Sequence, residues 1–319
     1  MRGVFLDIAT YKPDDRHPAL LHSVLEHWDF HEYTPPEKIT ARLEGADVLV
    51  TNKAKITADI IQQAKDLKLI VAGATGTDNI DAKAAAAHNI TVCNVPDYCT
   101  QAVAQHVFAL ILSLSSNIIP YHNLVQSGAW EAATGFNLLE YPIYELSGKT
   151  LGVIGYGHIG KAVERIATAF GMNVLIAERP NADTNRAGRT AFTQMLQQSD
   201  IITIHCPLND DTRGLIDADE LAQMKDSAIL INASRGGIIE ETALAEALRG
   251  GIIAGAGLDV LSKEPPNDGN ILLQLDMPNL IITPHCAWAS EEARLRMFEI
   301  IAANITAFQN GAPINVVSA

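Results

Sequence analysis

Cysteine is sparse in this sequence of 319 residues. The four cysteines, Cys93, Cys99, Cys206 and Cys286, include no CxxC pair, which favours a reducing compartment over a disulfide framework. Long hydrophobic runs are missing as well, because no stretch approaches the roughly 18 uninterrupted apolar residues of a membrane-spanning helix. The amino-terminal stretch reaches Asp7 too early for a secretory signal. We therefore expect a cytoplasmic protein that does not enter a membrane.

Positive charge is also scarce. Lys and Arg together number 23 against 37 Asp and Glu, which gives a net charge of −14. Nucleic acids and anionic membranes are bound through basic surfaces, so this balance argues against both as partners. It leaves an anionic small molecule open, because a few arginines inside a cleft can outweigh the global field. A chain of this length exceeds one ordinary core, so we expect two domains.

Short β-like runs alternate with helical stretches along the whole chain. This alternation predicts α/β layers built on parallel sheets. The expected strands are Val4–Ile8, Val48–Thr51, Leu69–Ala72, Thr91–Asn94, Thr150–Gly155, Asn173–Ala177, Ile201–His205, Ala228–Asn232, Ala254–Val260 and Leu280–Thr283. The expected helices include Pro18–Glu26, Ala58–Lys65, Ala102–Leu114, Lys161–Phe170 and Ser290–Phe308.

The sharpest local motif is a glycine-rich turn, GYGHIG, formed by residues 155–160. It follows an apolar strand and precedes a helical stretch, which is the context that a dinucleotide-binding fingerprint requires. Gly155 would permit the tight turn, Gly157 the close approach of a pyrophosphate, and Gly160 the packing of helix on strand. The helix N-terminus would then offer N–H groups and a partial positive charge to the phosphates.

The residues after the second strand of this unit bear on the choice of cofactor. Glu178 lies 18 residues past Gly160, where an acid accepts hydrogen bonds from the adenosine ribose. A carboxylate there favours NAD over NADP, because it repels the 2′-phosphate of NADP. Arg179 complicates this reading, since an arginine at the same place can bind that phosphate. We expect NAD, with NADP possible.

Three polar residues follow three later strands. Arg235 has a planar fork that grips carboxylates, and His285 titrates near neutrality and can exchange the proton that accompanies hydride transfer. Glu264 could hold the imidazole in orientation. Taken alone, each has an ordinary explanation as a surface charge or a turn histidine. Their joint occurrence after strands, downstream of the glycine-rich turn, favours a ligand crevice at the carboxyl edge of the sheet.

His22, His27 and His31 also invite a metal-site reading. Their spacings of five and four residues do not share one helical face, so solvent-facing histidines are the better explanation. We predict no metal site.

The ordered set of motifs resembles the D-2-hydroxyacid dehydrogenases, and within them the hydroxypyruvate reductase (glycerate dehydrogenase) branch. The resemblance spans nearly the whole chain. It rests on AGATGTDN at residues 72–79, NVPDYCTQAVAQH at 94–106, GFNLL at 135–139, the glycine-rich turn, HCPL at 205–208, TRG at 212–214, and the segments around Arg235, Glu264 and His285. Gln105 stands where many relatives carry Glu.

The resemblance implies a role for each matching residue. Arg235 would bind the substrate carboxylate and carbonyl, His285 would be the acid/base, and Glu264 its orienting partner. The N–H groups around Ala74, Thr75 and Gly76 would bind the same carboxylate, and Asp259 the nicotinamide carboxamide. Further cofactor contacts implied by the family are Thr100, Gly155, Gly157, His158, Ile159, Gly160, Glu178, Cys206, Pro207 and Ala233.

The family also implies an architecture and an activity. We expect a flavodoxin-like substrate domain, residues 1–99 plus 290–319, and a Rossmann NAD-binding domain, residues 100–289, with a cleft between them and a homodimeric assembly. The implied reaction is NAD(P)H-dependent reduction of hydroxypyruvate or glyoxylate to D-glycerate or glycolate. Another D-2-hydroxy acid, such as 3-phosphoglycerate, remains an alternative substrate. A binding protein of the NAD-sensing corepressor kind is a second alternative, since such proteins can retain the catalytic residues.

Overall fold

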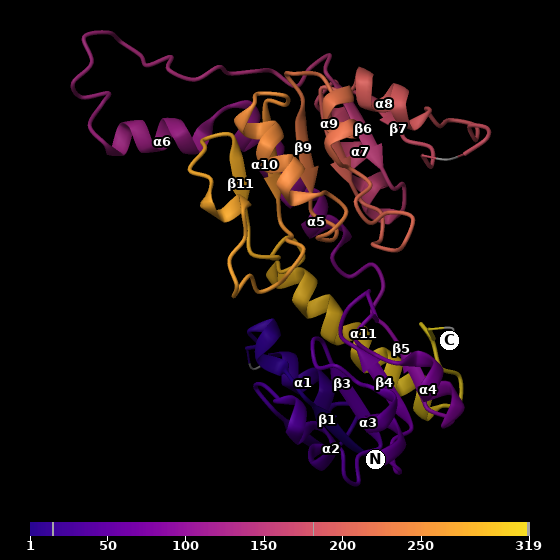
Figure 1. The fold of residues 1–319 in the computed structure, drawn as a ribbon. Helices are drawn as coiled ribbons and strands as arrows, with labels where there is room; N and C mark the ends of the chain where they lie inside the picture. The colour runs from indigo at the N-terminus through magenta and orange to yellow at the C-terminus, as the bar shows by residue number, and fades with distance from the viewer. Residues whose placement is uncertain (15, 181, 318–319) are drawn as a thin grey trace. The chain divides into compact units, whose positions relative to one another are not determined.

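The computed structural model describes residues 1–14, 16–180 and 182–317, which fall into two compact units (Figure 1). One unit comprises Met1–Cys99 together with Ala289–Ala319, and the other comprises Thr100–Trp288. The first unit is therefore built from both ends of the chain. Each unit has its own sheet and its own hydrophobic core.

The first unit contains a five-stranded parallel sheet in its described residues, with strand order β2-β1-β3-β4-β5. This is the flavodoxin-like order. Every residue of β3 and β4 is buried, as expected for parallel strands covered on both faces. The strands are β1 Arg2–Phe5, β2 His27–Phe30, β3 Val48–Thr51, β4 Leu69–Ala72 and β5 Thr91–Cys93.

Helices and short 3₁₀ turns surround this sheet. The longest, α11 (Glu291–Gln309), starts at the N-cap Ser290, whose side chain accepts from the N–H of Ala293, and packs on α1 and β4. The C-terminal segment thereby becomes part of the first core. The other helices are α1 Arg16–His22, α2 Ile39–Arg42, α3 Ala58–Gln63 and α4 Ala82–Ala87, with 3₁₀ turns η1 Ile8–Tyr11 and η2 Pro36–Lys38.

The second unit contains a six-stranded parallel sheet in its described part, with order β11-β10-β9-β8-β6-β7. The chain runs from β6 to β7 on one side and then returns to β8 on the other, so the order reverses between β6 and β8. Ligand crevices form at the carboxyl ends of strands beside such a reversal. The strands are β6 Thr150–Ile154, β7 Asn173–Ile176, β8 Ile201–Ile204, β9 Ile229–Asn232, β10 Gly255–Leu258 and β11 Leu280–Ile282.

Helices cover both faces of this second sheet (Figure 1). The apolar helix α5 is largely buried and packs on α7, β9 and β10, which agrees with its reading as a core helix. The helices are α5 Thr100–Ser115, α6 Ile118–Gln126, α7 His158–Ala169, α8 Phe192–Gln198, α9 Ala218–Gln223 and α10 Glu241–Arg249, with the 3₁₀ turn η3 Leu272–Gln274. The predicted fold class, two doubly wound parallel sheets, is confirmed.

Helix α6 and the segment that follows it, residues 118–144, form an arm that extends from the second sheet (Figure 1). The arm is weakly packed, since Phe136 is 93% exposed and Leu139 72%. Among the described residues no single helix is long and apolar enough to cross a bilayer, although α5 and α6 together, bent by 59°, have the length and composition to pass that test.

Candidate active site

The residues singled out in the second unit all lie at one edge of its sheet. Because the six strands are parallel, residues that directly follow them share the carboxyl edge. Gly155 follows β6, Glu178 follows β7, Cys206 follows β8, Ala233 follows β9, Asp259 follows β10 and His285 follows β11. Thr100 begins α5, and His158 and Ile159 begin α7.

The glycine-rich turn has the shape that a dinucleotide phosphate requires. Gly155 has φ +87°, and a Cβ there would lie 2.5 Å from the backbone N of Cys206. A Cβ on Gly160 would lie 2.4 Å from the carbonyl oxygen of Gly155, whereas one on Gly157 would meet nothing within 4 Å. Two glycines are thus needed for close packing, and the third leaves open space at the start of α7. The residues present fit a bound NAD(P) pyrophosphate.

The segment after β8 packs against this turn at His205, which is half-buried. His205 N donates to Ile154 O at 2.6 Å, and its Nε2 lies 3.0 Å from Thr203 Oγ1. Burial lowers the pKa of His205 to about 3, so the ring is neutral at physiological pH. Burial also raises the pKa of the Cys206 thiol to about 11, so the thiol stays protonated and is a poor nucleophile.

Glu178 lies where an acid for the adenosine ribose is predicted, but Arg186 already binds it. The guanidinium and backbone N of Arg186 donate to both carboxylate oxygens, and the N–H of Arg179 adds a further bond at 2.9 Å. Hydrogen bonds from Arg186 hold the pKa of Glu178 well below its usual range. Glu178 is therefore charged and internally paired, and its assignment to the ribose stays a prediction.

The structure brings Glu264 and His285 into direct contact. His285 Nδ1 lies 2.5 Å from Glu264 Oε2, while Glu264 Oε1 accepts from the N–H of Leu261 at 2.9 Å. The two side chains are 28% and 33% exposed, so the pair is accessible from solvent. Trp288 Nε1 donates to the carbonyl of His285 at 3.0 Å, and this hydrogen bond stabilises the turn. This is the arrangement of an imidazole oriented by a carboxylate.

Arg235 follows β9, the strand next to β10, and a local network shapes its turn. The Asn232 side chain accepts from Ser234 N and Oγ and donates to Arg235 O at 2.9 Å. Gly236 allows this turn to touch the next loop, because a Cβ there would lie 1.9 Å from Leu261 O. Arg235 Nη1 donates to Ser234 O at 2.8 Å, and the side chain is half-buried.

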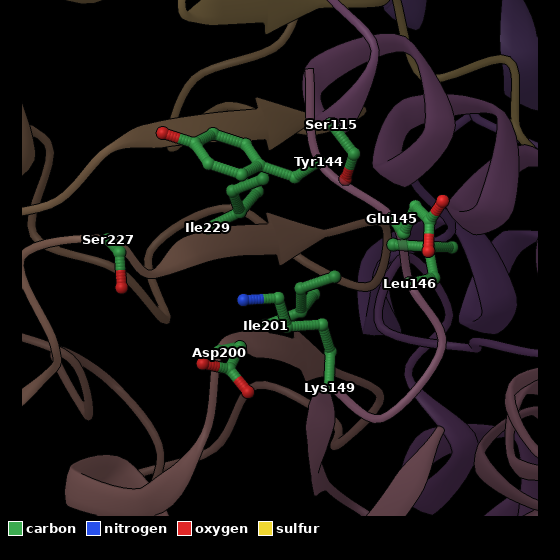
Figure 2. Close-up of a pocket in the computed structure, with 9 residues that line it drawn as sticks. All are labelled: Ser115, Tyr144, Glu145, Leu146, Lys149, Asp200, Ile201, Ser227 and Ile229. Carbon is green, nitrogen blue, oxygen red and sulfur yellow. The ribbon is translucent and has the colours of Figure 1, made fainter. Parts of the chain in front are cut away.

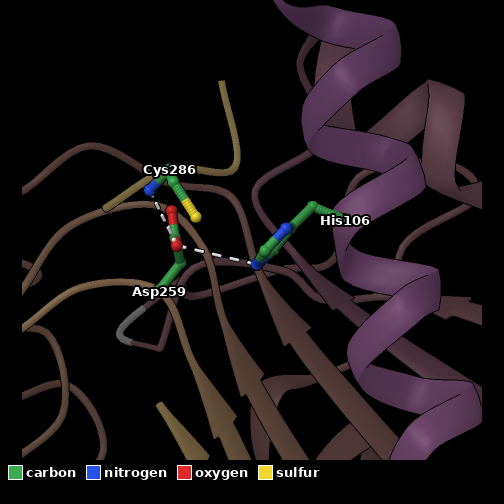
Figure 3. A group of neighbouring side chains, drawn as sticks. All are labelled: His106, Asp259 and Cys286. Carbon is green, nitrogen blue, oxygen red and sulfur yellow. Dashed lines mark hydrogen bonds and ion pairs between the residues drawn. The ribbon is translucent and has the colours of Figure 1, made fainter. Parts of the chain in front are cut away.

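Asp259 anchors the loop that carries His285 (Figure 3). Its carboxylate accepts from Cys286 N at 2.9 Å, the contact drawn in Figure 3. It also accepts from Ala287 N at 2.8 Å and Thr283 Oγ1 at 2.6 Å, and Asp259 is 1% exposed. The Asp259 carbonyl also accepts from His285 N at 2.8 Å. His285 has φ +52°, a left-handed conformation that this loop therefore has to hold. The nicotinamide role of Asp259 stays a prediction beside this anchoring role.

His106 and Thr283 extend this network, and the sequence did not single them out. His106 Nε2 lies 2.9 Å from Thr283 Oγ1 and 3.6 Å from Asp259 Oδ1. Since the Thr283 hydroxyl donates to Asp259, its oxygen accepts from His106 Nε2–H. Potential metal-ligand atoms of His106, Asp259 and Cys286 lie within 4.8 Å of one another (Figure 3). The hydrogen bonds to Asp259 account for this cluster without an ion.

In the first unit, the carbonyl groups of the loop after β4 are hydrogen-bonded within the unit. The carbonyls of Gly73, Ala74 and Thr75 accept from Tyr11 Oη at 2.7 Å, Val95 N at 3.0 Å and Asn94 Nδ2 at 2.8 Å. In a trans peptide the C=O and the next N–H point in opposite directions. The N–H groups of Ala74, Thr75 and Gly76 are thereby turned away from these partners, and their role in binding a carboxylate stays a prediction.

A pocket opens at the opposite, amino-terminal edge of the second sheet (Figure 2). Asp200 in this pocket is bonded by Lys225 Nζ and by the N–H of Thr150, both at 2.8 Å. These ion-pair and backbone bonds explain Asp200 as a structural residue. The lining residues are Ser115, Tyr144, Glu145, Leu146, Lys149, Asp200, Ile201, Ser227 and Ile229.

Known proteins are similar to this chain in sequence and in fold. The family model described as D-isomer specific 2-hydroxyacid dehydrogenase, NAD binding domain, matches residues 108–287. A glycerate dehydrogenase of Methylorubrum extorquens is 46% identical, with 92% of each chain covered. A hydroxypyruvate reductase of Blautia hydrogenotrophica is 37% identical over 91% of each chain. The crystal structure of a Thermus thermophilus protein superposes with TM-score 0.87 and 33% identity over 100% of both chains.

These matches cover the glycine-rich turn and the residues that follow β8 to β11. They show an NAD-binding domain and an oxidoreductase, as the motifs predict. The chain belongs to the D-isomer specific 2-hydroxyacid dehydrogenase family.

Proposed function

We propose that this enzyme uses NAD(P)H to reduce hydroxypyruvate or glyoxylate to D-glycerate or glycolate. The observation that carries the proposal is the Glu264–His285 pair, which lies on the same sheet edge as the glycine-rich turn and Arg235. The relatives named glycerate dehydrogenase and hydroxypyruvate reductase support this substrate class.

His285 is the proton donor in this reaction. Its Nδ1 is held by Glu264, so proton exchange with the substrate falls to Nε2. Bound NAD(P)H supplies the hydride that adds to the carbonyl carbon. Protonated His285 delivers its Nε2 proton to the carbonyl oxygen, which becomes the hydroxyl. The imidazole is left neutral with its Nδ1–H still donating to Glu264, so its orientation is kept for the next proton.

Arg235 binds the substrate carboxylate and polarises the carbonyl. A guanidinium carries five N–H donors in a planar fork, and the bond to Ser234 O uses one of them. The turn built by Asn232 fixes the base of the side chain. Since the substrate is itself an anion, a local cation is needed in a protein whose net charge is −14.

We assign the two units different roles, with substrate binding in the unit of residues 1–99 and 290–319 and NAD binding in residues 100–289. The N–H groups of Ala74, Thr75 and Gly76 support the first assignment, because they form an element for binding a carboxylate. The glycine-rich turn supports the second.

A keto-acid panel tests the proposed function. Purified enzyme is assayed with hydroxypyruvate, glyoxylate, pyruvate and 3-phosphohydroxypyruvate, each with NADH and NADPH, beside the His285→Ala variant. We expect hydroxypyruvate or glyoxylate to give the highest kcat/KM, and the variant to lose about 10²–10⁴ in kcat, as is typical for a general acid. Preference for the phosphorylated acid would overturn the substrate class. Tight NADH binding without turnover of any acid would indicate a sensor.

The exposed arm supports a homodimer. Apolar side chains that are not packed in one chain include Trp130, Phe136, Leu139 and Ile143, each more than half exposed. Several large apolar side chains exposed along one short segment are typical of an interaction site. Mass measurement by light scattering is expected to give a dimer, and Phe136→Ser with Leu139→Ser is expected to give monomers. A monomeric wild type would contradict the proposal.

The cysteines support a reducing, cytoplasmic location. Among the described residues, Cys93, Cys99, Cys206 and Cys286 form no disulfide, and Cys93 is buried. Cytoplasmic proteins keep thiols reduced. Fractionation of cells that express a tagged chain is expected to recover it in the cytoplasm.

A further inference from the structure

Three consecutive N–H groups of the loop that carries His285 donate to a single residue, Asp259. His285 N donates to the Asp259 carbonyl at 2.8 Å. Cys286 N and Ala287 N donate to its carboxylate at 2.9 and 2.8 Å. The loop follows β11, a strand of three half-buried residues at the edge of the sheet, so neighbouring strands hold it on one side only. The position of His285 therefore depends on how firmly the Asp259 carboxylate is held.

A further donor to this carboxylate, the Thr283 hydroxyl, is itself oriented by His106. Thr283 Oγ1 lies 2.6 Å from Asp259 Oδ1, and a second acceptor, Leu258 O, lies within reach at 3.4 Å. A hydroxyl has one hydrogen to donate and two lone pairs that accept. The Nε2–H of His106 donates to one lone pair at 2.9 Å, which favours the orientation in which the hydroxyl hydrogen points to the carboxylate.

His106 can anchor the loop because it lies on a buried helix of the second core. Val103, Val107 and Leu110 of α5 are buried, and the helix packs on α7, β9 and β10. The His106 side chain is 20% exposed and projects from α5 toward the Asp259 carboxylate (Figure 3). A contact across 177 positions of the sequence thus joins the loop after the edge strand to the core.

We propose that His106 is a positioning residue for His285, acting through the Thr283 hydroxyl and the Asp259 carboxylate. Loss of its N–H donor loosens the loop of residues 283–288 and slows proton delivery, whereas carboxylate binding at Arg235 is unaffected. This inference rests on the proposed reduction of a keto acid and adds to it a residue that acts only through its neighbours.

Three substitutions of His106 separate the N–H donor from the shape of the side chain. His106→Gln keeps an N–H donor at a similar distance from Cα, His106→Asn holds the same amide one methylene closer to the helix, and His106→Leu has no donor. We expect His106→Leu and His106→Asn to lower kcat by about 3- to 10-fold, as the loss of one neutral hydrogen bond allows, and His106→Gln to stay within about twofold. The KM for the keto acid is expected to stay within about twofold in all three, because Arg235 is untouched.

The rates are measured at saturating NADH, with Gln105→Leu as the matched control. Gln105 precedes His106 on the same helix and is exposed, so this change is expected to leave kcat and KM as they are. A His106→Leu enzyme within about twofold of the wild-type kcat would overturn the proposal, and so would a His106→Gln enzyme as slow as His106→Leu. A larger effect on KM than on kcat would show a general structural role and would overturn it too.

A double-mutant cycle with Thr283→Val tests the path through the hydroxyl. Thr283→Val removes the link, and His106→Leu in the same chain then removes a donor that has lost its acceptor. The double variant is therefore expected to have a kcat within about twofold of that of Thr283→Val alone. A kcat that falls by the product of the two single effects would contradict this path.

Hydrogen exchange, followed by mass spectrometry, tests the positioning without any turnover. The N–H groups of residues 285–287 are expected to exchange about 3- to 10-fold faster in His106→Leu and within about twofold of wild type in His106→Gln, because local opening frees them from Asp259. Exchange in the buried strands β8 and β9 reports whether each variant is folded. Unchanged exchange at residues 285–287 in His106→Leu would overturn the proposal. A wild type that shows this exchange pattern and reduces no keto acid would refute the proposed function alone, so the two failures are distinguishable.

Discussion

Glu264→Gln is the substitution that most sharply tests the acid/base geometry. The Glu264 carboxylate accepts from His285 Nδ1–H through Oε2 at 2.5 Å and from the Leu261 N–H through Oε1 at 2.9 Å. An amide of the same shape has one oxygen and one NH₂ group. If the oxygen faces His285, the NH₂ faces the Leu261 N–H and leaves that donor unpaired. If the oxygen faces Leu261, the NH₂ turns to His285 Nδ1, which can then carry no proton.

Both orientations penalise the protonated imidazole. The first removes the carboxylate charge that stabilises the imidazolium, and hydrogen bonds to charged groups contribute about 1.5–3 kcal/mol. The second excludes the imidazolium, because an imidazolium needs a proton on both nitrogens. Losing this much stabilisation of the protonated imidazole corresponds to a fall in kcat of roughly 10- to 100-fold for keto-acid reduction. The KM for NADH is expected to stay within about threefold, since Glu264 is assigned no cofactor contact.

The assay follows NADH oxidation at saturating keto acid, with Glu241→Gln as the matched control. Glu241 holds the same loop by accepting from Ser262 N and Oγ and from Asn270 Nδ2, all within 2.8 Å. Among the described residues, Glu241 forms no hydrogen bond with His285. Equal losses in both variants would show that loop stability, and not the oriented imidazole, limits the rate. A Glu264→Gln enzyme with more than about a third of the wild-type kcat would refute the reasoning.

Three further predictions follow from the same sheet edge. Arg235→Lys is expected to raise the KM for the keto acid by about tenfold or more and to leave the NADH affinity unchanged. The reason is that the ammonium is a point charge, whereas the guanidinium can form two parallel bonds to a carboxylate. An unchanged KM would exclude Arg235 from carboxylate binding. Asp259→Asn leaves at least one of the donors Cys286 N, Ala287 N and Thr283 Oγ1 without an acceptor. We expect it to lower the free energy of unfolding in urea by about 1–3 kcal/mol and to lower kcat. A variant as stable as the wild type would show that the loop does not depend on this anchor. Gly155→Ala places a Cβ 2.5 Å from Cys206 N, on a residue whose φ is +87°. We therefore expect NADH binding, measured by calorimetry, to weaken by about tenfold or more. An unchanged affinity would show that this turn is not needed for the cofactor.

The sequence predicts the buried strands of both units well and the edges less well. Val48–Thr51 and Leu69–Ala72 match β3 and β4, because four consecutive apolar residues between turns leave little choice. The first strand is displaced, since β1 spans Arg2–Phe5 and Ile8 already begins a 3₁₀ turn. The strand β2, His27–Phe30, was not predicted. It lies at the sheet edge with no fully buried residue, so it carries no hydrophobic run.

Two contacts of the candidate site that sequence reasoning missed involve partners far apart in the chain. His106 meets Thr283 across 177 positions, and Tyr11 meets Gly73 across 62. Periodicity and strand ends report on local structure, and they carry no information on which distant side chain completes a network. Arg186 was missed for a different reason. It lies in a polar loop, eight residues past Glu178, where a charge reads as solvated.

The net charge of the chain illustrates how far composition informs a site. A net charge of −14 argues against polyanionic partners, because a polyanion contacts a wide area of the protein and is repelled by the negative charge of that surface. At physiological ionic strength, solvent-exposed charges more than about 8 Å apart are largely screened, so a phosphate or carboxylate group responds mainly to the charges nearest to it. At the carboxyl edge of the second sheet those near charges include Arg235 after β9 and Arg186 and Arg189 after β7, with Glu178 covered by Arg186. An acidic protein can therefore bind anionic cofactors and substrates at this edge, because parallel strands gather its arginines there.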